Sequence, residues 1–143
     1  SAGAFAGAAH GTHTASVSGT AAGSAINGSC SGNWSGTTDS GGIFSGTATI
    51  VSCSAGGEYY QPVGATDPIS ATMNAAGNIT TVAVSQTVSG LTVSCPTGSG
   101  TATSTTFSLT NQCTVSGIPT GCTPPTSCNV NLTVTDTFTG TRP

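Results

Sequence analysis

The sequence predicts an all-β fold: a single disulfide-stapled β-sandwich, immunoglobulin-like or jelly-roll-like, with an extended N-terminal strand. Short runs that alternate apolar and polar residues recur at intervals of roughly ten residues, with Gly-, Pro- and Asn-containing turns between them. No run keeps the i, i+3, i+4 spacing of an amphipathic helix for more than one turn. The length of 143 residues is that of one domain, and six cysteines offer covalent cross-links.

The clearest strand pattern lies near the end of the chain, in residues 128–139. Every second residue lies on one side of an extended chain, and the apolar residues on that side are Val130, Leu132, Val134 and Phe138. Asn and Thr residues occupy the other side, which predicts a half-buried strand. Asp136 interrupts the apolar side close to the end of the run. Because strands usually leave the core there, we expect a solvated strand end rather than a buried functional carboxylate.

Residues 1–28 are built almost wholly from Ser, Ala, Gly and Thr, yet residues 12–20 alternate. One side of this segment carries His13, Ala15, Val17 and Gly19, and the other side carries hydroxyl groups. A strand with so small an inner face cannot build a core alone, but its backbone can hydrogen-bond in a groove of another sheet. Three interpretations stay open: a flexible tail, an ordinary first strand, and a donor strand for another chain. We therefore divide the chain into a candidate donor segment, residues 1–28, and a β-sandwich domain, residues 29–143.

Two turn-rich stretches, a strand and a loop are predicted next. Residues 28–36 and 39–42 are rich in Gly, Ser, Asp and Asn, which favour turns. Residues 43–53 are predicted to form a strand that ends in Cys53. Residues 56–68 are expected to form a long loop, which holds both tyrosines and is therefore the most chemically varied surface.

The rest of the chain is predicted as further short strands. Residues 69–74 and 79–88 form a hairpin around the turn at residues 75–78, and residues 91–95 resume the alternation. We expect residues 96–100, which contain Pro and three residues that favour turns, to reverse the chain into a strand at residues 101–110.

The cysteines are predicted to form disulfides rather than a zinc site, because their number is even and no two are spaced as C-x-x-C. Disulfides form in oxidising compartments, so we expect a secreted or cell-surface protein. Six cysteines allow fifteen connectivities. Neighbouring strand ends and one short turn favour three pairs: Cys30 with Cys53, Cys95 with Cys113, and Cys122 with Cys128. Each of the first two would close a loop worth roughly 3 kcal/mol.

The composition excludes several kinds of partner. Charged residues make up 3% of the chain, the net charge is −3, and Arg142 is the single basic residue apart from histidine. Without a basic patch, neither nucleic acid nor an anionic membrane surface is an expected partner. No apolar run is long enough to span a membrane, and we expect Ser1 to be the N-terminus left after removal of a leader. The core must be thin, so the fold is expected to need disulfides, neighbouring subunits, or both.

The sequence offers little chemistry for catalysis. Gly28-Ser-Cys-Ser-Gly32 has the shape of a hydrolase nucleophile elbow, but the elbow needs a preceding strand and a following helix, so Cys30 is better explained as half of a disulfide. His10 and His13 are three residues apart and would lie on opposite faces of a strand, which argues against a metal pair. We expect no enzymatic activity, cofactor or metal. Four sequons mark candidate glycosylation sites, at Asn27, Asn33, Asn78 and Asn131.

The alternating segment at residues 12–20, the Cys-bearing body and the closing strand at residues 128–139 resemble the small secreted β-sandwich subunits of bacterial and archaeal surface filaments. In those filaments an N-terminal strand completes the sheet of the next subunit. The resemblance implies a structural subunit of an extracellular, pilus-like homopolymer whose partner is another copy of the chain. The end of the chain, Thr-Gly-Thr-Arg-Pro143, departs from the aromatic, alternating strand of many chaperone-assembled pilins, so no assembly chaperone is implied.

A different class of function stays open as the alternative. Trp34, Tyr59 and Tyr60 could together form an aromatic stacking surface, as in a secreted carbohydrate-binding or adhesive module. Its partners would be surface glycans or other cells.

Overall fold

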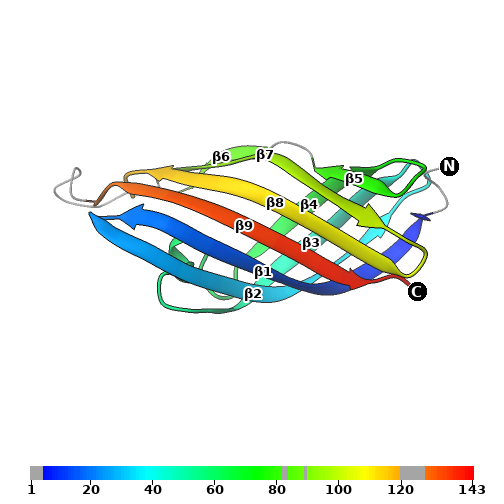
Figure 1. Cartoon of the computed structure of the whole chain (residues 1–143), viewed down its shortest axis with the longest axis horizontal. Helices are drawn as coiled ribbons and strands as arrows, with labels where there is room; N and C mark the ends of the chain where they lie inside the picture. The colour runs from blue at the N-terminus through cyan, green and yellow to red at the C-terminus, as the bar shows by residue number, and fades with distance from the viewer. Residues whose placement is uncertain (1–4, 82–83, 89, 120–127) are drawn as a thin grey trace.

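The computed structural model describes residues 5–81, 84–88, 90–119 and 128–143, and these are mainly strands (Figure 1). The main elements, in chain order, are β1 Gly7–Ala21, β2 Ser24–Thr38, β3 Ile43–Cys53, the 3-10 helix η2 Gly57–Tyr59, β4 Thr66–Met73, β5 Asn78–Thr81, β6 Val84–Val88, β7 Leu91–Ala102, β8 Thr106–Gly117 and β9 Val130–Thr141. No α-helix occurs in this described part. The predicted all-β class is confirmed.

All nine strands belong to one antiparallel sheet, in the order β5-β4-β3-β2-β1-β9-β8-β7-β6. The short strand β5 also pairs with β7, so the sheet closes on itself. In Figure 1 the long strands β8, β9, β1 and β2 run side by side, and the start of β1 lies at the same end of the sheet as the end of β9. The predicted sandwich is not shown as such, because the strand pairing joins all nine of these strands into one sheet.

The core lies inside this closed sheet, and aromatic rings fill one half of it. Trp34 on β2, Phe44 on β3 and Phe107 on β8 contact one another, with ring centroids 4.9 to 5.8 Å apart. Since β8 is not a sheet neighbour of β2 or β3, these contacts pack one part of the sheet against another. The other half of the core is mainly aliphatic and includes the half-cystines Cys30, Cys95 and Cys113.

The predicted turn at residues 28–36 is wrong, because these residues lie within β2. Their glycines serve packing rather than reversal of the chain. A Cβ atom on Gly36 would lie 2.4 Å from the ring of Phe44, and one on Gly32 would lie 1.7 Å from the carbonyl oxygen of Thr49. Only glycine fits at these two positions, so a composition typical of turns occurs here in the middle of a strand.

Several local predictions are confirmed and one other is wrong. β3 has the predicted bounds, and a turn lies at residues 39–42. The hairpin predicted around residues 75–78 is confirmed for β4 and β5, whereas residues 84–88 of its predicted second arm pair with β7. Residues 96–100, however, continue β7, and the chain turns instead between Ala102 and Thr106. Proline has no backbone N–H to donate to a neighbouring strand. Pro96 is tolerated because the pairing of β7 with β8 shifts between Ser94 and Thr97, so no regular backbone hydrogen bond is needed there.

Two of the three predicted disulfides are confirmed. Cys30 on β2 is bonded to Cys53 on β3, with Cα atoms 4.0 Å apart, and Cys95 on β7 is bonded to Cys113 on β8, with Cα atoms 4.1 Å apart. Both join strands that are neighbours in the sheet. Cys128 is disulfide-bonded, and its predicted partner Cys122 lies outside the described residues.

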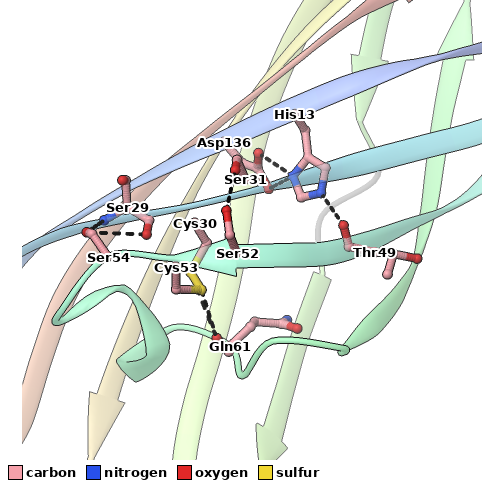
Figure 2. The surroundings of a disulfide bond; sticks show 10 residues. All are labelled: His13, Ser29, Cys30, Ser31, Thr49, Ser52, Cys53, Ser54, Gln61 and Asp136. Carbon is pink, nitrogen blue, oxygen red and sulfur yellow. Dashed lines mark hydrogen bonds and ion pairs between the residues drawn. A yellow bond between two sulfur atoms is a disulfide. The ribbon is translucent and has the colours of Figure 1, made fainter.

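The first disulfide also anchors the loop between β3 and β4 (Figure 2). The sulfur of Cys53 lies 3.6 Å from the carbonyl oxygen of Gln61. A disulfide sulfur carries no proton, so this is a packing contact rather than a hydrogen bond. Beside the disulfide, the hydroxyl groups of Ser31 on β2 and Ser52 on β3 are hydrogen-bonded at 3.1 Å. The contact of Gln61 thus places the loop against the β2–β3 pair.

Candidate functional site

The N-terminal strand β1 occupies the middle of the sheet. It pairs along its whole length with β2, and from His10 to Ala21 with β9. In the single chain, then, residues 7–21 form an ordinary strand and not a flexible tail. The predicted division after residue 28 falls inside β2, and it does not separate two structural units.

The inner face of β1 is small and fully enclosed. His13, Ala15 and Val17 are 2%, 0% and 1% exposed, and they point into the core between β2 and β9. Gly19, which shares their parity in the sequence, is exposed and acts through its backbone instead. Its φ is +139°, and a Cβ atom there would lie 2.2 Å from the carbonyl oxygen of Asn131 on β9.

Gly19→Ala is expected to destabilise the chain by about 1–3 kcal/mol, because the added methyl group meets backbone in a conformation that L residues rarely adopt. Ser18→Thr, one position away on the exposed outer face, should change the free energy of unfolding by less than about 0.5 kcal/mol. Chemical denaturation of both variants measures this. Equal stability of the two variants would show that the close approach of β1 to β9 is unimportant.

A tight turn joins β1 to β2. Its two residues, Ala22 and Gly23, both have positive φ, 51° and 78°. This is the pattern of a type I′ hairpin turn, for which Asn-Gly is the favoured sequence. Ala22 is the one non-glycine residue with positive φ in the described part of the chain. The left-handed conformation costs alanine roughly 1 kcal/mol or more. The turn formed by Ala22 and Gly23, called the hinge below, is therefore strained while the hairpin is closed.

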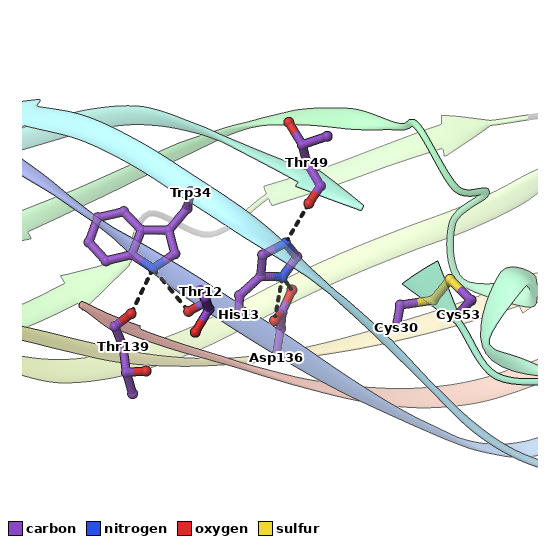
Figure 3. A network of polar contacts seen from close by, with 8 residues as sticks. All are labelled: Thr12, His13, Cys30, Trp34, Thr49, Cys53, Asp136 and Thr139. Atoms are coloured by element: carbon purple, nitrogen blue, oxygen red, sulfur yellow. Dashed lines mark hydrogen bonds and ion pairs between the residues drawn. A yellow bond between two sulfur atoms is a disulfide. The ribbon is translucent and has the colours of Figure 1, made fainter. Parts of the chain in front are cut away.

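A buried ion pair fastens β1 to β9. The Nδ1 atom of His13 lies 3.0 Å and 3.3 Å from the two carboxylate oxygens of Asp136 (Figure 3). Asp136 is 5% exposed, so the predicted solvated strand end is wrong. The physical reason is that β9 continues to Thr141, which places Asp136 inside the strand, on the core side. The ring of His13 also stacks on Phe138, with centroids 5.0 Å apart.

The hydrogen bonds of His13 constrain its protonation. Nε2 lies 3.1 Å from the carbonyl oxygen of Thr49 on β3, and because a carbonyl only accepts, Nε2 carries a proton. A second proton can then lie between Nδ1 and Asp136. Burial alone lowers the pKa of His13, but the hydrogen bond and charge of Asp136, the Thr49 carbonyl and the charge of Asp67 together raise it above its ordinary value.

A cavity of about 140 Å³ adjoins this pair, lined in part by Tyr60, Gln61 and Asp67. Burial is the main cause that raises the pKa of Asp67; the charge of Asp136 adds to it, whereas the hydrogen bond from Gln61 acts against it. Burial, together with the charges of both aspartates, also raises the pKa of the Tyr60 phenol. The cavity is smaller than the roughly 300–1,000 Å³ of ordinary ligand sites.

The other candidate residues do not join this site. His10 is exposed and His13 is buried, so the two histidines lie on opposite faces of β1 as expected. Among the described residues, no group of three or more His, Cys, Asp or Glu side chains could hold a metal ion. Within the same residues, no helix has the length and apolar character needed to cross a membrane.

The predicted aromatic stacking surface is not formed. Trp34 is 3% exposed, and its indole N–H donates to the backbone carbonyls of Thr12 and Thr139, each at 3.1 Å (Figure 3). Tyr60 lines the internal cavity, and of the three rings only Tyr59, 45% exposed, is largely open to solvent. Trp34 therefore links β2 to both β1 and β9.

The four sequon asparagines, Asn27, Asn33, Asn78 and Asn131, are all exposed. Each acceptor is followed two residues later by Ser or Thr on the same strand face, because side chains alternate along a strand. Attachment of a glycan at these positions would not disturb the core, and glycosylation stays a prediction.

No protein-family model, curated protein or solved structure matches the chain. The geometry of β1 and its surroundings is thus the basis for an account of function.

Proposed function

We propose that the chain is a structural subunit of an extracellular, pilus-like homopolymer, in which β1 of each subunit fills the place between β2 and β9 of the next. The observation that carries the proposal is the position of β1: it pairs with a different strand along each of its two edges, and a strained two-residue turn, the hinge, joins it to β2. Another copy's β1 can make the same bonds in the same place.

Exchange of β1 keeps almost every contact of the closed chain. The backbone hydrogen bonds to β2 and β9 and the pair of His13 with Asp136 are remade between chains instead of within one. Opening the hinge lets Ala22 leave the left-handed conformation, which recovers about 1 kcal/mol. Association still loses translational and rotational freedom, so a high local concentration of subunits is needed.

The connectivity of the exchange permits an open filament. Each subunit gives β1 to one neighbour and receives β1 from another, which is a head-to-tail contact. Where the rotation between neighbours does not close, such contacts produce an open polymer.

The described disulfides are placed to permit this exchange. Cys30–Cys53 joins β2 to β3, and Cys95–Cys113 joins β7 to β8. Neither involves β1, which contains no cysteine, so β1 can leave while the two bridged strand pairs stay joined. Disulfides also agree with assembly in an oxidising compartment, and we propose secretion to the cell surface on that basis.

The outer surface around β1 offers no charge that would oppose assembly. The outward residues of β1 and β9 near the middle of these strands are hydroxyl residues: Thr12, Thr14, Ser16, Ser18, Thr133, Thr135, Thr137 and Thr139. Two subunits can therefore approach without electrostatic repulsion along this face. The alternative function, a carbohydrate-binding or adhesive module, loses its main support because Trp34 is buried.

Electron microscopy of the purified full-length chain tests the proposal. Because exchange requires opening of β1, we expect filaments after the chain is refolded at high concentration, and monomers after it is refolded at high dilution. A chain that stays monomeric in size-exclusion chromatography after concentrated refolding, under every condition tried, would contradict the proposed function.

A further inference from the structure

A buried ion pair lies at the seam that the proposed exchange must open. We infer that the pair of His13 with Asp136 is a proton-operated latch, which holds β1 in its place while the pair is protonated and releases β1 when the proton is lost. Its effect on polymerisation rests on the proposed exchange of β1. Its effect on the opening of β1 within one chain does not.

The latch joins three strands at one point. His13 comes from β1, Asp136 from β9, and the Thr49 carbonyl from β3, with bonds of 3.0 Å and 3.1 Å from the two ring nitrogens. Figure 2 shows the imidazole between these two partners. Because His13 and Asp136 are only 2% and 5% exposed, the pair is shielded from bulk solvent while β1 is in place. Both bonds must break before β1 can leave.

The other titratable groups that face His13 are acids, so a protonated His13 supplies the positive charge that balances the negative charge around it. Asp136 faces it from β9, and Asp67 on β4 and Tyr60 after η2 line the same cavity. All three are acids, and His13 is the basic side chain among the described residues that line this cavity. Removal of the proton leaves His13 with one N–H for two acceptors, so either the Asp136 carboxylate or the Thr49 carbonyl loses its hydrogen bond. The buried Asp136 carboxylate also loses the positive charge that balances it, which is unfavourable.

The direction of the pH effect follows from proton linkage. While β1 is paired with β2 and β9, the pKa of His13 lies above its ordinary value. When β1 leaves the sheet, His13 is in water and its pKa returns to the ordinary value. The closed form therefore binds the proton more tightly. The stabilisation by the latch is complete below the ordinary pKa and is lost as the pH rises through the raised pKa. Between the two values the open fraction should grow by up to about tenfold per pH unit, and outside them it should be constant.

The latch controls the rate of exchange more than its final outcome. In a polymer, His13 of one subunit meets Asp136 of the next, so the same pair stabilises the joint as stabilises the monomer. Raising the pH should speed conversion between monomer and polymer in both directions. The final ratio of the two forms at a given concentration should change far less.

Hydrogen exchange of the full-length monomer across this pH range, corrected for the intrinsic pH dependence of amide exchange, tests the latch directly. We expect protection of the β1 amides to fall by up to about tenfold per pH unit between the ordinary histidine pKa and the raised pKa of His13, and to be constant outside that interval. Protection of the β8 amides in the same molecule should not follow this course. His10→Gln, a change of the exposed histidine on the same strand, should behave as wild type, whereas Asp136→Asn should remove the pH dependence of β1.

Light scattering during polymerisation provides the separate readout. Protection of β1 that does not depend on pH in the wild-type chain overturns the latch, even if filaments form and even if Asp136→Asn does not fold. Protection that falls with pH in β1 but not in β8, in a chain that never polymerises, supports the latch and counts against the proposed filament.

Discussion

Deletion of residues 1–23 is expected to yield a chain that does not fold as a soluble monomer and that recovers its fold when a peptide of residues 7–21 is added. Without β1, the backbone edges of β2 and β9 lose their partners. The aliphatic half of the core also loses Ala15, Val17 and Ala21. Exposed strand edges and apolar surface promote aggregation. Circular dichroism and size-exclusion chromatography, with and without the peptide, measure the outcome.

Two altered peptides provide matched controls for this experiment. Val17→Asp puts a carboxylate at a position that is 1% exposed, and it should weaken rescue by more than about a hundredfold, because burying an unpaired charge costs several kcal/mol. Ser16→Asp puts the same group on the exposed outer face, and it should still rescue. A truncated chain that folds and forms normal filaments with no peptide would show that β1 is not the connecting strand.

Opposite changes at the hinge are expected to move assembly in opposite directions. Ala22→Asn gives the turn the favoured Asn-Gly sequence, and it should stabilise the closed hairpin and slow polymerisation. Ala22→Pro fixes φ near −65°, far from the 51° of the closed turn, and it also removes the N–H that donates to Asn129 at 3.0 Å. The closed monomer should lose about 3 kcal/mol or more, which shifts the balance strongly toward polymer.

The hinge variants are compared by refolding them at equal protein concentration and measuring the polymer fraction by size-exclusion chromatography. Each 1.4 kcal/mol of difference between closed and exchanged forms is a factor of about ten in their equilibrium constant. The polymer fraction should rise from Ala22→Asn through wild type to Ala22→Pro. The same fraction in all three would mean that the hinge does not take part in assembly.

Local features of the fold were accessible from the sequence because they depend on nearby residues. The alternation within residues 43–53 predicted β3 with its observed bounds, and two cysteine pairs followed from strand ends that lie close in the chain. The parity of His13, Ala15 and Val17 likewise placed their side chains on one face of β1.

The ion pair could not be predicted, because it depends on sheet register. His13 and Asp136 are 123 residues apart, and they meet only because β1 lies beside β9 with Ala15 opposite Asp136. The one available signal was a charged residue on the apolar side of a regular strand. A polar residue in that position needs a partner if the strand continues, and the inner-face histidine of residues 12–20 was the matching group.

Glycine and proline gave misleading signals for related reasons. Both residue types favour turns, yet Gly32 and Gly36 make room for neighbouring atoms inside β2, and Pro96 lies where the register of β7 shifts. In each case a neighbouring strand decides which residue fits at the position, and local composition does not reveal the neighbouring strand. Trp34 was wrongly predicted to lie on the surface because residues 28–36 were predicted to form a turn, whereas it is buried in β2.

Cysteine cross-linking across the edges of β9 tests the exchange of β1 most directly. Thr14 on β1 and Thr110 on β8 both lie opposite Thr137 on β9. In filaments of Thr14→Cys/Thr137→Cys, mild oxidation should link different chains and give a ladder in non-reducing electrophoresis. The control Thr110→Cys/Thr137→Cys should give cross-linked monomers. A ladder from the first pair alone is the predicted result, and filaments that yield only cross-linked monomers from both pairs would contradict strand exchange.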